Sequence, residues 1–152
     1  MHTKIRTLKT YVWSVLLYGC ECWTISNNNK KKLEATAMWF IRRLMGISWK
    51  ERKTNEEVLK LSGTSRSLMK TVRKRQMEFL GHINRKNGLE KIVLCGKIEG
   101  KRSRGRPRTS HIASLNAFAF EKKIPNNQCI KLADNRVEWR TMIADACNRP
   151  DT

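Results

Sequence analysis

Four cations between residues 66 and 74 have a spacing that suits contact with phosphates. Arg66, Lys70, Arg73 and Lys74 stand at i, i+4, i+7 and i+8, so a helix through them would turn all four to one side. Almost no acidic residue accompanies them to neutralise their charge. A rigid row of this kind could contact several phosphates at once, although an ordinary solvated helix face is the alternative.

An aromatic residue among cations is the second candidate. Trp39 lies off the apolar stripe of its own segment and shares a side with Lys32, Arg42 and Arg43. A tryptophan exposed there could stack on a base or a sugar. Packing of Trp39 against another helix, for example the first, is the reading that we favour.

The most basic stretch of the chain runs from Lys101 to Arg108 and contains Arg-Gly-Arg-Pro. Arg104, Gly105, Arg106 and Pro107 form the core of an AT-hook, whose thin backbone fits a narrow minor groove with two arginines along its floor. The pattern is short, so general nucleic-acid contact is the broader expectation. The candidate residues of this segment are Lys101, Arg102, Arg104, Gly105, Arg106 and Arg108.

The sequence shows no cluster of residues that could perform catalysis. The aspartates Asp134, Asp145 and Asp151 stand near the C-terminus, and the first two are expected about three helical turns apart. Two-metal phosphoryl transfer needs clustered carboxylates. No phosphate-binding glycine loop and no nucleophile beside a histidine is apparent, so we expect neither a catalytic centre nor a cofactor.

The charge balance favours a polyanionic partner. Lys and Arg total 32 against 13 acids, a net charge of +19. DNA or RNA is the expected partner, ahead of an anionic membrane surface. The apolar run from Tyr11 to Cys20 is too short to span a bilayer, and it makes a poor signal peptide.

The five cysteines include no Cys-x-x-Cys pair, which argues against a zinc site and for reduced intracellular thiols. We expect a nuclear location.

The elements that must position these residues are expected to be helices. Prolines are rare and no period-two alternation is sustained. We expect a buried first helix over about 4–18, and helices over about 29–45, 54–62, 65–85 and 134–147, the last packing through Val137, Trp139 and Ile143. Ser26–Asn29 and Thr54–Glu57 offer N-cap chemistry, and Gly46 and Gly63 are natural stops. The expected architecture is all-α: a thumb-like bundle over 1–90, a basic linker over 91–110 and a helical tail over 111–152.

A series of short motifs in order resembles one family. Leu16–Trp23 is similar to the LLYG-x-E-x-W stretch of non-LTR (LINE-type) retrotransposon reverse transcriptases, just downstream of the palm. The match continues in order through Leu33-Glu34, Met38-Trp39, Arg42–Leu44, Gly46–Trp49, Arg52–Val58, Phe79–His82, Gly96–Arg102, Arg104–Arg108, Leu132–Arg136 and Trp139-Arg140. Each motif alone is weak, whereas their order is specific. The chain departs from the family at Thr109–Ile112, where a tryptophan-containing helix start is usual, and lacks the Cys/His knuckle of some relatives.

The resemblance implies the thumb and post-thumb part of an RNA-directed DNA polymerase, without the palm aspartates. Its expected role is to clamp a template–primer through phosphates, with the palm of an intact enzyme as a further partner. Two alternatives remain open: a stand-alone architectural DNA-binding protein that uses Arg104–Arg108, and a helical protein-interaction module.

Overall fold

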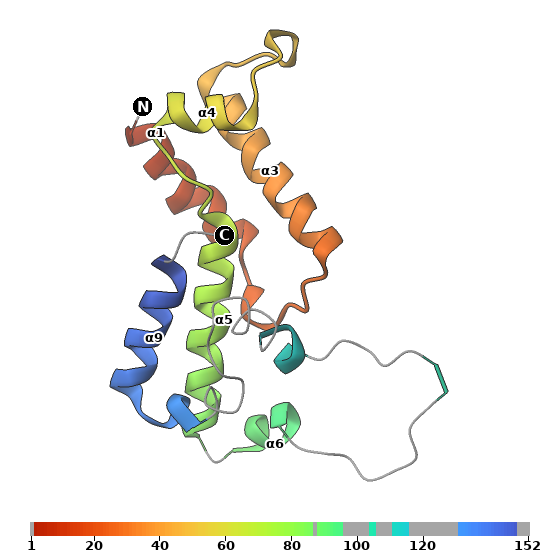
Figure 1. Ribbon diagram of the computed structural model, residues 1–152, viewed down its shortest axis with the longest axis vertical. Coiled ribbons are helices and arrows are strands. Elements are labelled where there is room, and N and C mark those ends of the chain that lie inside the picture. Colours follow the sequence, from red (N-terminus) through yellow and green to blue (C-terminus); the bar gives the residue numbers. More distant parts are fainter. Residues whose placement is uncertain (1, 87, 96–103, 106–110, 116–130, 149–152) are drawn as a thin grey trace. The chain divides into compact units, whose positions relative to one another are not determined.

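The computed structural model describes residues 2–86, 88–95, 104–105, 111–115 and 131–148 (Figure 1). Every regular element in these residues is a helix, which confirms the predicted all-α class. The chain forms two compact units: Met1–Cys20 with Ile25–Val72, here unit one, and Glu21–Thr24 with Arg73–Thr152, here unit two. This division differs from the boundaries expected near residues 90 and 110, because Met77 and Leu80 share a core with residues close to the C-terminus.

The first helical stretch is continuous but changes its winding. It consists of α1 (His2–Thr7), a π-helical turn η1 (Leu8–Val12) and α2 (Trp13–Leu16), with the Trp13 N–H donating to the Leu8 carbonyl. Leu8 and Trp13 are both buried, and five residues of α-helix would set them about 140° apart. The wider i→i+5 turn brings them nearer to one side, which explains its position.

Burial of this stretch is one-sided, whereas a buried first helix was expected. Ile5, Leu8, Trp13 and Leu17 are buried, whereas Tyr11 is 69% exposed, Val15 77% and Tyr18 86%. The expectation was wrong because a dense apolar sequence does not specify how many neighbours a small unit can supply. The 3-10 turn η2 (Cys20–Cys22) follows.

Helix α3 (Asn27–Met45) carries the predicted terminal signals. The Ser26 hydroxyl accepts from the Asn29 N–H at 3.3 Å, and Gly46 ends the helix in the left-handed conformation at φ +67. The helix begins two residues before the expected Asn29. Met38 and Ile41 on its inner side are buried.

Helix α4 (Asn55–Ser62) follows a short 3-10 turn, η3 (Trp49–Glu51), and contains the predicted capping box. The Glu57 N–H donates to Thr54 Oγ1 at 3.3 Å, and the Thr54 N–H donates to Glu57 Oε2 at 2.9 Å. Gly63, at φ +63, closes α4 as its position predicted.

Helix α5 (Leu68–Arg85) spans the boundary between the two units, which falls after Val72. It starts three residues later than expected, so Arg66 precedes it. Leu68, Val72, Leu80 and Ile83 of this helix are buried. The short helix α6 (Leu89–Cys95) comes next and leaves Leu89, Ile92 and Val93 exposed.

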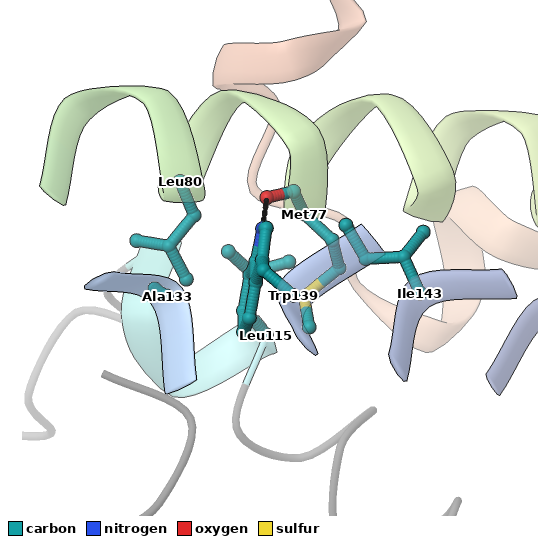
Figure 2. Packing of buried hydrophobic residues seen from close by; sticks show 6 residues of the cluster. All are labelled: Met77, Leu80, Leu115, Ala133, Trp139 and Ile143. Carbon is teal, nitrogen blue, oxygen red and sulfur yellow. Dashed lines mark hydrogen bonds between the residues drawn. The ribbon is translucent and has the colours of Figure 1, made fainter. Parts of the chain in front are cut away.

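The core of unit two joins α5 to residues far along the chain (Figure 2). Trp139 lies at its centre, and its indole Nε1–H donates to the Met77 carbonyl at 3.0 Å. The ring passes so close to α5 that a Cβ on Gly81 would lie 2.5 Å from Trp139 Cδ1 and closer still to Nε1. The other buried members of the cluster are Leu80, Leu115, Ala133 and Ile143.

Helix α9 (Arg136–Asn148) carries Trp139 and Ile143 into this core, as predicted. Its start is capped by Asn135, whose Oδ1 accepts from the Val137 N–H at 3.1 Å. Val137 was expected to pack but is 73% exposed, so that expectation was wrong. Residue 137 lies two positions from Trp139, about 200° around the helix, and therefore faces away from the core.

Candidate nucleic-acid interface

Exposed cations are distributed over both units. Lys53 pairs with Glu51 at 2.6 Å, and Lys74 lies 4.0 Å from Glu78. Exposed pairs of this kind contribute little free energy and leave both side chains free to rearrange. The exposed cations of the described residues are Lys4, Arg6, Lys9, Lys30, Lys31, Lys32, Arg43, Lys50, Arg52, Lys60, Arg66, Lys74, Lys86, Arg104, Lys131, Arg136 and Arg140.

The cationic row predicted over 66–74 is only partly a surface feature. Arg66 and Lys74 are exposed and Lys70 is half-buried. Because α5 begins at Leu68, Arg66 does not share the helical spacing of the other three. Lys70 and Lys74 remain one turn apart on α5, so they lie on one side of the helix.

Arg73 has a structural role instead. Its guanidinium Nη1 donates to Gln76 Oε1 at 3.0 Å and to Ser114 Oγ at 3.1 Å. Buried Gln76 in turn donates from Nε2 to the Trp23 carbonyl at 2.9 Å. These bonds link α5, the segment at residue 23 and helical residues 111–115 within unit two, and sequence spacing could not reveal them.

His111 lies beside this polar group. Both of its ring nitrogens are buried and have no hydrogen-bond partner among the described residues. Burial lowers the pKa of His111, the nearby Trp23 carbonyl raises it in part, and the positive charge of Arg73 lowers it further. The neutral imidazole is therefore the form that unit two accommodates.

The neighbouring arginines of α3 differ in the same way as Arg73 and Lys74. Arg42 Nη2 donates to the Lys53 carbonyl at 2.8 Å and to Asn55 Oδ1 at 2.9 Å, which fixes the start of α4 against α3. Arg43 is exposed. Of the two predicted contact residues, Arg43 is thus the one that presents its charge to solvent.

Trp39 is exposed, contrary to the packing against another helix that we favoured. It is 58% exposed, and its ring makes an edge-to-face contact with Phe40 at a centroid distance of 5.1 Å. Exposed Lys32 and Arg43 lie on the same side of α3. Lys32 was predicted on this side but not as a contact residue, and it is exposed there.

The arginine-rich segment is described only at two residues. Arg104 and Gly105 are exposed, and Gly105 has φ +112, a conformation that residues with a side chain rarely adopt. The predicted contacts at Lys101, Arg102, Arg106 and Arg108 lie outside the described residues, as does Pro107.

The described acids do not gather into a metal site. No group of three or more His, Cys, Asp or Glu residues is close enough in this part of the chain to hold a metal ion. Asp134 Oδ1 accepts from Asn84 Nδ2 at 2.7 Å and precedes α9, whereas Asp145 lies on that helix. Asp151 lies outside the described residues.

Comparisons of the chain with family models, curated proteins and solved structures gave no match. Among the described helices, none is both long and apolar enough to cross a bilayer.

Proposed function

We propose that this chain is the thumb and post-thumb part of a non-LTR retrotransposon reverse transcriptase, which holds nucleic acid through its phosphates and contains no catalytic centre of its own. The observation that carries the binding proposal is the net charge of +19. Such an excess repels itself unless a polyanion offsets it. Nucleic acid offers regularly spaced phosphates that release counterions on binding.

The placement of the cations supports contact through several surfaces. Lys70 and Lys74 are one turn apart on α5, and Arg43 is exposed on α3. Helical positions hold such side chains in a fixed register, which suits contacts that orient a backbone without reading bases. The segment at Arg104 adds further exposed charge.

The ordered motifs from Leu16–Trp23 to Trp139-Arg140 support the family proposal. Several of them coincide with residues that have a definite structural task. Arg42 anchors the start of α4, Gly81 admits the indole ring of Trp139, and Trp139 centres the core of unit two. Motif positions with such tasks are those at which replacement is most costly.

A salt titration tests the binding proposal. The affinity for a mixed-sequence duplex is measured across a potassium chloride series, for the parent chain and for the Lys70→Ala/Lys74→Ala variant. If roughly six to eight phosphates are contacted, log K falls against log salt with a slope of about −5 to −7. In the variant the slope should be shallower, its magnitude smaller by up to about 2. A slope near zero for the parent chain refutes the proposal and favours a protein-interaction module.

The origin has its own test, which is independent of affinity. Long-read sequencing of the transcript and of its genomic flank shows whether an upstream frame encodes a palm with paired aspartates. Such a frame supports the retrotransposon assignment.

Binding that is confined to A·T-rich duplexes and abolished by Arg104→Ala/Arg106→Ala would favour the architectural alternative.

A further inference from the structure

We infer that α3 carries a stacking site for an unpaired nucleotide, built from Trp39 between Lys32 and Arg43. The inference rests on the proposed function and narrows it to single-stranded nucleic acid at this surface. Trp39 is 58% exposed and leaves apolar surface in water, and a base is a flat partner that could cover it.

The spacing along α3 gives this site one direction. At 100° per residue, Asn28, Lys32, Ala35 and Arg43 fall within about 40° of Trp39 around the helix axis. Lys32 and Arg43 are separated along that axis by roughly 16 Å, with Trp39 between them. The small Ala35 next to the ring leaves room for a base to approach.

The charge of this side matches a phosphate backbone. Glu34 is the acid of α3 and lies about 140° around the axis from Trp39, so no carboxylate of this helix shares the side. Lys32 stands near the N-terminal end of α3, whose first turn contains no acid, whereas Lys31 lies about 80° and Lys30 about 180° around the axis from Trp39. A protein partner for this side of α3 would have to be strongly acidic, whereas any single-stranded nucleic acid supplies the required negative charge.

The arrangement selects unpaired bases, because a helix side of this kind cannot reach a ring that is stacked inside a duplex. Arg42 is committed to the Lys53 carbonyl and Asn55, so Arg43 and Lys32 are the cations that hold the flanking phosphates. Stacking on an aromatic face tolerates any base, and the site is therefore expected to bind without sequence preference.

Binding of the full chain to oligothymidylate and to a duplex of equal length tests the inference. Trp39→Leu should weaken oligothymidylate binding by roughly 5- to 150-fold and change duplex binding by less than about twofold. Trp39→Phe, which keeps a ring, should recover most of the loss. Tyr11→Leu, at a tyrosine that is 69% exposed in the same unit, is the matched control and should have little effect.

Salt dependence separates stacking from charge at this site. Arg43→Ala should reduce the magnitude of the slope of log K against log salt on the single strand by about 0.7, whereas Trp39→Leu should leave that slope unchanged. Oligothymidylate should also quench a component of the parent tryptophan emission that is absent in Trp39→Phe. This optical signal requires no comparison of variant affinities.

Three outcomes overturn the inference. The first is an unchanged single-strand affinity in Trp39→Leu while the parent keeps a steep salt slope, a result that leaves the proposed function intact. The second is an equal loss on duplex and single strand, or in Tyr11→Leu. The third is a loss of self-association in Trp39→Leu without any loss of nucleic-acid binding, which would assign the stripe to contact between two copies.

Discussion

Gly81 has an unusual part in the core of unit two, because its missing side chain makes room for the indole ring of Trp139. Alanine normally improves a helix interior by up to about 1 kcal/mol over glycine. Here a Cβ would lie 2.5 Å from Trp139 Cδ1, so the helix or the ring would have to move. We therefore expect Gly81→Ala to destabilise unit two by about 1–3 kcal/mol, as overpacking of a core does.

Urea unfolding followed by circular dichroism measures this change in the free energy of unfolding. Trp139→Phe serves as the second arm of a double-mutant cycle, because it removes the ring edge that the new Cβ would meet. The Gly81→Ala penalty should shrink in the Trp139→Phe background. A stabilising Gly81→Ala would show that the ring does not approach α5 in solution.

His111 should make the stability of unit two depend on pH. Its pKa in the folded chain lies below the ordinary value of 6.5, so the unfolded chain takes up the proton first. The contribution of the neutral ring is complete above about pH 6.5 and is lost as the pH falls through the lowered folded pKa. Thermal unfolding between pH 7.5 and pH 5 should therefore show a falling midpoint.

The matched control for this prediction is the exposed histidine at position 82. His111→Gln should flatten the fall in midpoint over that range, whereas His82→Gln should retain it. An identical pH dependence in the parent and in His111→Gln would show that other groups are responsible.

At the scale of elements, adjacent cations of α5 should separate into one that supports the fold and one that binds. Arg73→Ala removes the hydrogen bonds to Gln76 and Ser114, and should cost about 1–3 kcal/mol because it leaves polar partners unsatisfied. Lys74→Ala removes an exposed charge and should change stability by less than about 0.5 kcal/mol. On duplex, Lys74→Ala should reduce the magnitude of the slope of log K against log salt by about 0.9, as the loss of one phosphate contact does.

Unfolding and binding are measured on the same preparations of both variants. The assignment is contradicted if Lys74→Ala unfolds more easily than Arg73→Ala. It is also contradicted if Arg73→Ala keeps the parent stability and changes only the salt slope.

Local signals explain which elements were predictable. Ser26, Thr54, Gly46 and Gly63 act within a few residues of where they stand, so the ends of α3 and α4 could be derived from the sequence. The π turn at Leu8–Val12 could not, because it depends on which side chains the rest of unit one accepts.

The exposure of the candidate cations was predictable only in part. Charge and spacing predict a cationic surface, and Lys74 and Arg43 are exposed as that requires. Whether a particular arginine is exposed depends on acceptors elsewhere in the chain. Arg73 finds Ser114, which is 41 residues away, and no local pattern contains that information.

For the whole molecule, the proposal predicts binding without turnover. The chain should neither extend a primer on an RNA template nor cleave nucleic acid with magnesium or manganese, because its described acids do not gather into a group that could hold a metal ion. Primer extension and nuclease assays with the purified chain, beside a no-protein blank and an active polymerase, measure this. Extension above the blank that persists through further purification would contradict the assignment of the chain as a binding part alone.

The segment Glu21–Thr24 belongs to unit two although the chain on both sides of it belongs to unit one. During synthesis from the N-terminus, the partners of unit one are available once residue 72 has left the ribosome. Gln76, which binds the Trp23 carbonyl, follows only four residues later, but the core around Met77 waits for Trp139, 62 residues further along the chain. A nascent chain would therefore carry an unfinished unit two for about half of its length, the interval in which a chaperone could first engage it.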